Sequence, residues 1–178
     1  MICEGLNNSY LNSQNLKIIG QSTLRGEVKI SGAKNSALVL IAASLLTDEK
    51  IILDNVPQLT DVEKMGNILK KLGVKLQTNN HQLIIDSTNK SIKELPYELV
   101  NGLRASFFCI GPLLARFGEA SIPLPGGCNI GKRPINEHIS GLKALGADIV
   151  IEKGIVKAKL IKRERRLYGA NIRLNCPS

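Results

Sequence analysis

The sequence predicts an α/β fold in which one short unit of helix, strand, helix and hairpin occurs twice. Apolar residues make up 43% of the 178-residue chain, which is enough for a domain with a core of aliphatic side chains. Segments with helical and with strand periodicity alternate along the chain. The stretches KKLGVKL at Lys70–Leu76 and KALGADI at Lys143–Ile149 match in register, which indicates an internal repeat.

The first copy of the unit is expected to follow a polar leader. Residues 1–15 are rich in Asn and Ser, and Leu16–Ile19 and Leu24–Ile30 have the composition of short strands. Thr60 and Glu63 have the spacing of a capping box, which predicts the start of a helix. The predicted elements of this copy are a helix over Lys34–Leu46, a strand over Ile51–Leu53, a helix over Asp61–Leu72 and a hairpin of Val74–Thr78 with Gln82–Asp86.

The second copy has the same order of elements. Arg104 occupies the place that Lys34 has in the first copy, and Gly111–Pro112 is expected to kink the helix that follows. Helices between successive strands predict parallel crossovers, so with the hairpins the sheets are expected to be mixed. Ala170–Leu174 is expected to be a strand that begins a third copy. The predicted elements of the second copy are a helix over Leu103–Ala115, a strand over Glu119–Leu124, a helix over Pro134–Leu145 and a hairpin of Ala147–Glu152 with Ile155–Leu160.

The charge of the chain is positive and uneven. The formal net charge is +9; residues 1–90 hold ten Lys or Arg against eight Asp or Glu, and residues 91–178 hold fourteen against seven. A basic excess of this kind favours an anionic partner. Aromatic residues make up only 3% of the chain and no nucleic-acid-binding motif is visible, so nucleic acid is not the expected partner.

Membrane, secretory and metal-binding classes find no support in the sequence. The longest apolar run, Ala37–Leu46, is too short to span a bilayer, and the first residues lack the pattern of a signal peptide. The four cysteines are widely spaced and form neither a metal-ligand pattern nor a disulfide framework. A cytoplasmic protein without a metal or cofactor is therefore expected.

The most distinctive stretch is Pro123–His138, PLPGGCNIGKRPINEH. Glycines on either side of Cys128 leave its thiol uncovered and let the backbone approach a ligand closely. Lys132, Arg133 and the helix start that follows favour an anion and a reactive thiolate. From the residues alone, an ordinary glycine-rich loop with a small buried cysteine explains the stretch equally well.

These stretches resemble the UDP-N-acetylglucosamine 1-carboxyvinyltransferase family of enolpyruvyl transferases. The matching segments are Ile30–Ala37 (ISGAKNSA), Leu103–Ser106 (LRAS), Gly111–Gly118 (GPLLARFG), Leu124–Pro134 (LPGGCNIGKRP) and His138–Ala147 (HISGLKALGA). The resemblance implies a truncated inside-out α/β barrel of repeated βαβαββ units, the fold shared by enolpyruvyl transferases and RNA 3′-phosphate cyclases. It implies that residues 1–33 pack with a second, C-terminal domain that is missing here. Residues 34–178 would then form the first domain, with repeats over 34–90 and 91–161 and the start of a third.

The reaction implied by the resemblance is transfer of the enolpyruvyl group of phosphoenolpyruvate to the 3-hydroxyl of UDP-N-acetylglucosamine, with release of phosphate, in peptidoglycan synthesis. Cys128 matches the family's reactive cysteine, which delivers a proton or assists product release and which fosfomycin alkylates. The family's proton-abstracting aspartate comes from the missing part, so the chain alone is expected to be inactive and the complete protein to be a monomer. The residues implied to bind the two substrates are Lys34, Asn35, Arg104, Arg133, Pro134, Ile135, Asn136 and Glu137.

Other interpretations stay open beside this one. Lys34 beside Asn35 is also what a solvated lysine next to a helix-capping residue would look like, and Arg104 is also consistent with a surface residue at a helix end. An enolpyruvyl transferase acting on shikimate 3-phosphate has the same repeats but lacks the GGC loop. A basic domain that binds nucleic acid, or an inactive truncated copy of the enzyme, is a further alternative.

Overall fold

The computed structural model describes residue 20 and residues 23–88, 95–125, 135–161 and 166–175. Its backbone divides into two units, residues 1–30 and residues 31–178. In the first unit, residues 23–30 contain no strand, and Leu24, Val28 and Ile30 are 67%, 82% and 77% exposed. The predicted strand over Leu24–Ile30 is therefore wrong, because no neighbouring strand in the described chain pairs with its backbone. The predicted strand over Leu16–Ile19 lies outside the described residues.

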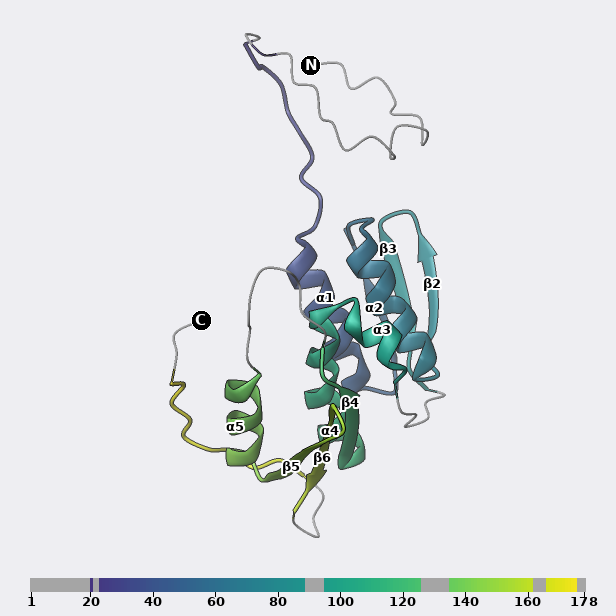
Figure 1. The fold of residues 1–178 in the computed structure, drawn as a ribbon. Coiled ribbons are helices and arrows are strands. Elements are labelled where there is room, and N and C mark those ends of the chain that lie inside the picture. The colour runs from purple at the N-terminus through teal and green to yellow at the C-terminus, as the bar shows by residue number, and fades with distance from the viewer. Residues whose placement is uncertain (1–19, 21–22, 89–94, 126–134, 162–165, 176–178) are drawn as a thin grey trace. The chain divides into compact units, whose positions relative to one another are not determined.

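The first copy of the repeat forms the sequence helix, strand, helix, hairpin that the periodicity predicts. The prediction is confirmed with shifts of one to three residues at the ends. The elements are α1 Lys34–Ala43, the 3-10 turn η2 Ser44–Leu46, β1 Lys50–Leu53, α2 Thr60–Lys71, β2 Lys75–Asn79 and β3 Gln82–Asp86 (Figure 1).

The second copy repeats this order with one more short helix at its beginning. The predicted long helix is divided in two, and the strand and hairpin lie where the sequence places them. The elements are α3 Tyr97–Asn101, the 3-10 helix η3 Arg104–Cys109, α4 Ile110–Phe117, β4 Glu119–Pro123, α5 Asn136–Ala144, β5 Ala147–Glu152 and β6 Ile155–Leu160 (Figure 1).

The two copies have the same sheet topology. One sheet has the order β1-β3-β2 and the other has the order β4-β6-β5. Their registers also correspond, with Lys75 opposite Asp86 in the first and Asp148 opposite Lys159 in the second. Every pairing between the described strands is antiparallel, so the expectation of mixed sheets is wrong. The reason is that the last strand of each hairpin lies between the two strands that the crossover helix connects.

The internal repeat is also visible where α2 and α5 end. Gly73 and Gly146 both have left-handed backbone conformations, with φ of 86° and 97°. The amide of Gly73 donates to the carbonyl of Lys70, and that of Gly146 to the carbonyl of Lys143, each at 3.0 Å. A residue in this conformation ends a helix by satisfying its last carbonyls, and glycine adopts it without steric cost.

Several details of the predicted elements differ in the structure. Helix α2 begins at Thr60 and its N-cap is Leu59. Thr60 is therefore the first residue of the helix and not its cap, and no capping box forms. The second-copy helix changes from 3-10 to α between Cys109 and Ile110, directly before the Gly111–Pro112 pair. Pro112 fits the first turn of α4 because amides there have no partner within the helix. Helix α5 begins at Asn136, and residues 170–174 form no strand.

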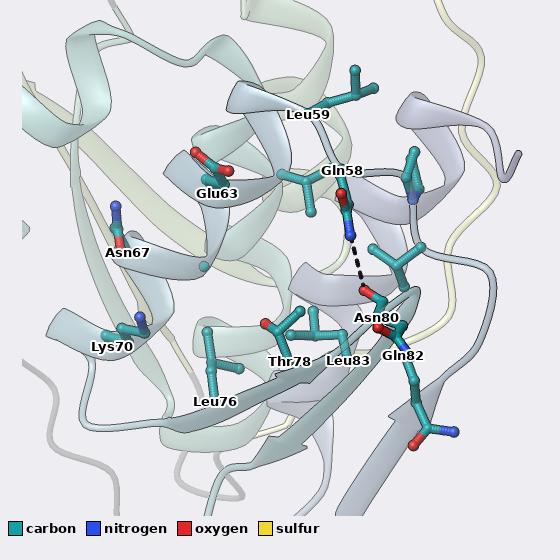
Figure 2. A pocket seen from close by; sticks show the side chains of 14 residues that line it. Gln58, Leu59, Glu63, Asn67, Lys70, Leu76, Thr78, Asn80, Gln82 and Leu83 are labelled. Atoms are coloured by element: carbon teal, nitrogen blue, oxygen red, sulfur yellow. Dashed lines mark hydrogen bonds between the residues drawn. The ribbon is translucent and has the colours of Figure 1, made fainter. Parts of the chain in front are cut away.

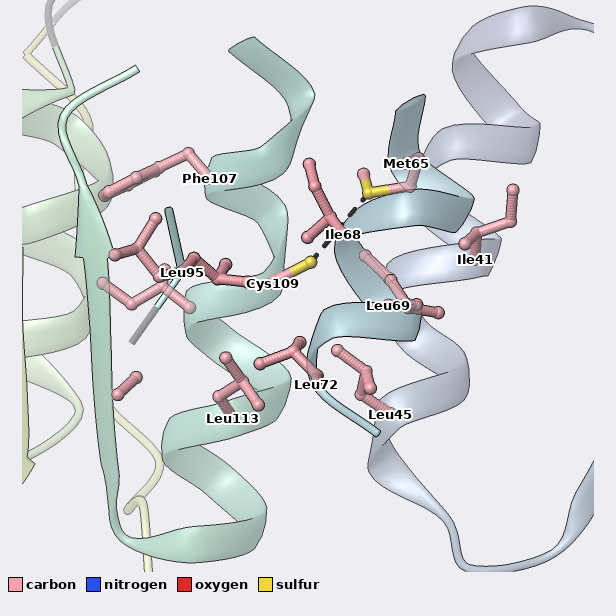
Figure 3. Close-up of a cluster of buried hydrophobic side chains, with 14 of the residues drawn as sticks. Ile41, Leu45, Met65, Ile68, Leu69, Leu72, Leu95, Phe107, Cys109 and Leu113 are labelled. Carbon is pink, nitrogen blue, oxygen red and sulfur yellow. Dashed lines mark hydrogen bonds between the residues drawn. The ribbon is translucent and has the colours of Figure 1, made fainter. Parts of the chain in front are cut away.

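The core lies between the helices, where α1 packs against α2 and both contact η3. Met65, Ile68 and Leu69 of α2 are fully buried. Figure 3 shows the Cys109 thiol within this cluster, with its sulfur 4.0 Å from that of Met65. Burial raises the pKa of Cys109 to about 12, so its thiol stays protonated and unreactive at neutral pH. Cys109 is therefore a core residue.

A largely covered arginine joins the two copies. Arg116, near the end of α4, donates to the carbonyl of Leu45 at 2.7 Å and to the hydroxyl of Ser87 at 3.3 Å. It also forms an ion pair with Asp48, although its own side chain is only 10% exposed. The Ser87 hydroxyl in turn donates to the carbonyl of Thr47. These contacts hold the end of α4 against the segment that follows α1, so the two repeats pack in a fixed arrangement.

Candidate functional site

A pocket of about 520 Å³ lies where several helices begin. Its walls come from the first residues of α1, the first turn of α2, the start of η3 and the start of α5. We call it the helix-start pocket. The polar side chains that line it are Lys34, Asn35, Asp61, Arg104 and His138.

The repeat explains why these helix starts meet. A Cβ atom on Gly32 would overlap the backbone carbonyl of Asn55, so the chain entering α1 passes directly against the chain leading to α2. From α2, Lys64 donates to the carbonyl of Gly102 at 3.3 Å, immediately before η3. These two contacts bring the beginnings of α1, α2 and η3 to the same end of the helical layer.

Lys34 and Asp61 form an ion pair inside this pocket. The Lys34 ammonium lies 2.8 Å from the Asp61 carboxylate, and the two side chains are 47% and 34% exposed. Helix α1 has no side-chain cap at Ala33 and no acidic residue in its first turn. The first amides of a helix have no partner within the helix, and in α1 no side-chain cap takes that place. Their dipoles therefore add to the positive charge of Lys34.

Aromatic rings form part of the apolar side of the pocket. The His138 ring contacts the Phe107 ring edge-to-face, with centroids 5.7 Å apart and an interplanar angle of 85°. It also lies 6.4 Å from the centroid of Phe108. These contacts dock the first turn of α5 onto η3 and leave Ile135 facing the same pocket.

The structure brings four of the predicted substrate-binding residues together, because Lys34, Asn35, Arg104 and Ile135 all line the helix-start pocket. Asn136 and Glu137 do not line it. The Glu137 carboxylate accepts hydrogen bonds from the backbone and side-chain amides of Asn175, at 3.0 and 3.1 Å. Three further predicted residues lie outside the described residues, namely Cys128, Arg133 and Pro134.

The sequence analysis assigns no role to two of the polar residues that line the pocket, Asp61 and His138. Asp61 has the sequence context of an ordinary acidic residue in the first turn of a helix, and His138 that of a helix-face residue. The signal that could have found them is the repeat itself. Lys34 and Arg104 begin equivalent helices, and the helices that follow them, α2 and α5, begin at the same end. The chain around Asp61 and His138 is then expected close to both basic residues.

A second cavity, also of about 520 Å³, lies between α2 and the β2–β3 hairpin. Figure 2 shows Glu63, Asn67 and Lys70 along one side of it and Thr78 along the other. Gln58 closes one end by donating to the carbonyl of Asn80 at 3.3 Å. Its one lysine is matched by one glutamate, and none of the predicted site residues line it, so the helix-start pocket is the better candidate for an anionic ligand.

The described residues give no indication of a metal centre or a membrane span. In the described ranges, His, Cys, Asp and Glu side chains form no group of three that could hold a metal ion. No helix among those same residues has the length and apolar character needed to cross a bilayer.

The family of the chain follows from comparison with known proteins. Residues 18–178 match the family of EPSP synthase (3-phosphoshikimate 1-carboxyvinyltransferase). The chain belongs to the EPSP synthase family. Solved structures of enolpyruvyl transferases have the same fold at low sequence identity. The enolpyruvyl transferase NikO from Streptomyces tendae is 21% identical, with a TM-score of 0.67 over 84% of this chain and 32% of its own. An EPSP synthase from Acinetobacter baumannii is 19% identical, with a TM-score of 0.64 over 86% of this chain and 35% of its own.

Within the EPSP synthase family, the chain has much more similar relatives. UDP-N-acetylglucosamine 1-carboxyvinyltransferase from Prochlorococcus marinus strain MIT 9515 is 80% identical over all 178 residues. The enzyme of that name from strain AS9601 is 72% identical over the same length, and the one from Parasynechococcus marenigrum is 57% identical over 163 residues, 92% of this chain. The chain spans 39% of the length of the first two relatives and 38% of the third. The resemblance stated from the motifs is thereby confirmed, and so is the enolpyruvyl transferase fold.

Proposed function

We propose that this chain supplies the phosphate-binding part of an enolpyruvyl transferase that moves the enolpyruvyl group of phosphoenolpyruvate to the 3-hydroxyl of UDP-N-acetylglucosamine. The observation that carries the proposal is the high identity, along the whole chain, to enzymes named UDP-N-acetylglucosamine 1-carboxyvinyltransferase. The solved EPSP synthases that share the fold are far more distant in sequence. The acceptor is therefore the UDP-sugar and not shikimate 3-phosphate, and the process served is peptidoglycan synthesis.

The helix-start pocket has the charges that the first substrate requires. Phosphoenolpyruvate carries a phosphate and a carboxylate, and Lys34, Arg104 and the open first turn of α1 are positive groups around one cavity. Arg104 can hold a phosphate or carboxylate through two parallel hydrogen bonds, which a lysine cannot do. Asn35, at the second position of α1, can donate its side-chain amide to the same anion.

The reaction breaks the bond between C2 of phosphoenolpyruvate and its bridging oxygen, and forms a bond from C2 to the sugar 3-oxygen. The hydroxyl loses its proton, C3 gains one transiently, and inorganic phosphate leaves with the electrons of the broken bond. Positive groups around the phosphate stabilise the charge that develops on the leaving group. We assign the proton at C3, or release of the product, to Cys128, and contacts with the UDP-sugar to Arg133, Pro134, Ile135, Asn136 and Glu137.

The test is a hybrid enzyme in which this chain replaces the matching residues of the Prochlorococcus marinus MIT 9515 relative. The hybrid is expected to release phosphate from phosphoenolpyruvate when UDP-N-acetylglucosamine is present, and not when shikimate 3-phosphate replaces it. The 178-residue chain alone should show little or no turnover. A hybrid that prefers shikimate 3-phosphate, or that folds but uses neither acceptor, would overturn the proposal.

Variants of the hybrid separate the roles of individual residues. Lys34→Ala should raise the KM for phosphoenolpyruvate by at least tenfold, because a charge-assisted contact of about 1.5–3 kcal/mol is lost. Cys128→Ser should lower kcat, whereas Cys3→Ser, far from the loop in sequence, should leave kcat unchanged. Equal effects of the two cysteine variants would contradict the role given to Cys128.

A further inference from the structure

The partner of Lys34 in the pocket has a role that the proposed reaction does not explain. Asp61 places a negative charge in the cavity that is expected to receive an anion, 2.8 Å from the ammonium that should bind it. An acidic side chain at such a position weakens the site unless it performs some other task there. The geometry of the ion pair indicates what that task is.

We propose that Asp61 competes with the ligand for Lys34: its carboxylate holds the Lys34 ammonium in the helix-start pocket and releases it when a phosphate-bearing ligand enters. This inference rests on the function proposed above. The ammonium is thus kept at the start of α1 in the empty pocket instead of moving freely in solvent. Ligand binding then replaces the Lys34–Asp61 ion pair with an ion pair between Lys34 and the ligand. The free energy needed to break the first pair makes binding of the ligand weaker.

The exchange is feasible because the pair is partly exposed. Ion pairs between exposed side chains change an equilibrium by about fivefold or less. With exposed fractions of 47% and 34%, Lys34 and Asp61 are in this class. A phosphate dianion offers more charge than one carboxylate and can also accept from the first amides of α1, which have no cap.

Asp61 also keeps a favourable position after Lys34 leaves it. It lies in the first turn of α2, where the helix dipole stabilises a negative charge. Its carboxylate is therefore not left without compensation when the ammonium turns to the ligand. Because solvent and the α2 dipole both stabilise its charge, the Asp61 carboxylate can lose its ion pair with Lys34 at a lower free-energy cost than a buried carboxylate could.

Among the described residues, a similar ion pair lies away from the helix-start pocket. Lys157 and Glu152, on neighbouring strands of the β5–β6 hairpin, lie 2.9 Å apart, and Lys157 is 47% exposed, as Lys34 is. Neither residue lines the helix-start pocket. The two lysines therefore have similar ion pairs and equal exposure, and they differ in whether they line the helix-start pocket.

The experiment is an NMR titration of the 178-residue chain, labelled with ¹³C at lysine Cε, with phosphoenolpyruvate as the probe and inorganic phosphate as a second probe. The Lys34 signal should shift on titration while the Lys157 signal does not. In Asp61→Asn, which keeps a hydrogen-bond acceptor but removes the charge, the apparent Kd should fall roughly two- to fivefold. Asp61→Glu should restore the original Kd, and Glu152→Gln should leave it unchanged.

The outcomes separate the inference from the proposed function. An unchanged or larger Kd in a folded Asp61→Asn variant would overturn the inference, since a residue with a purely structural role alters stability and not affinity. The inference would also be overturned if the Lys34 signal of Asp61→Asn shifted on titration with the same Kd as that of the unsubstituted chain. If the hybrid enzyme uses no UDP-sugar while Asp61→Asn still tightens phosphoenolpyruvate, the proposed function fails and the exchange between ion pairs stands.

Discussion

The crossover helices α2 and α5 occupy equivalent places in the two repeats and serve different purposes. The offset of 73 residues that relates Gly73 to Gly146 also relates Met65 to His138 and Leu69 to Leu142. Five residues of α2 are buried, whereas α5 has none. Where the first repeat has a core methionine, the second has an exposed histidine that lines the helix-start pocket. One helix of the pair is used for packing, and the other forms a wall of the site.

The sheets show a second difference at corresponding positions. In the first sheet Asp86 lies between Lys50 and Lys75, and in the second Lys159 lies between Glu119 and Asp148. The signs of the charges are reversed while the pattern of attraction is kept. Cross-strand pairs of opposite charge stabilise a sheet in either order, so the register survives although the residues have changed.

The largest effect is expected from a pair of substitutions that tests the difference between the helices. Leu69→Ala removes a fully buried side chain and should lower the free energy of unfolding by about 3 kcal/mol. Leu142→Ala, at the equivalent but half-buried position, should cost about 1 kcal/mol. Urea denaturation followed by circular dichroism measures both. Equal losses would show that α5 contributes to the core as much as α2 does.

A smaller effect is expected from the arginine that joins the repeats. Arg116→Met should destabilise the chain by about 2 kcal/mol, because the carbonyl of Leu45 and the hydroxyl of Ser87 lose a charged donor. The control is Lys157→Met, which removes an exposed ion pair and should change stability by less than about 0.5 kcal/mol. The same denaturation experiment compares them. If the two variants are equally stable, the contacts of Arg116 do not hold the repeats together.

The smallest effect is a difference in acid sensitivity between the sheets. Hydrogen bonds from the hydroxyl and the amide of Thr88 hold the pKa of Asp86 below its usual value. A lowered folded-state pKa gives stability that is present above the unfolded pKa of about 4 and is lost as the pH falls through the folded pKa. Asp86→Asn should therefore make the loss of stability between pH 5 and pH 3 shallower, as measured by urea midpoints at the two pH values. Asp148→Asn, in the second sheet, is the comparison. An identical pH dependence of wild type and Asp86→Asn would contradict this account.

Local patterns in the sequence were sufficient for the elements and for the repeat. The predicted ends of α2 and α5 lie directly before Gly73 and Gly146, because glycine adopts the left-handed conformation that ends a helix without steric cost. The β2–β3 and β5–β6 hairpins formed where alternating residues flank a turn. Errors arose where a choice depends on distant partners. The strand over Leu24–Ile30 needs a neighbouring strand to pair with. The capping box, by contrast, was a local error, because α2 begins one residue earlier than predicted and Leu59 occupies the cap position.

The candidate site shows the same division. Lys34, Asn35 and Arg104 were implied by the family resemblance of the motifs that contain them, and such motifs can be recognised one segment at a time. That they share a pocket with Asp61 and His138 depends on how two copies of one unit pack, and no single segment contains that information. The sequence by itself determined which residues begin helices and which lie in strands, since these follow from backbone preference and periodicity. Only the tertiary structure decided which helix starts meet, because contacts between segments far apart in the chain arise from packing of the shared core.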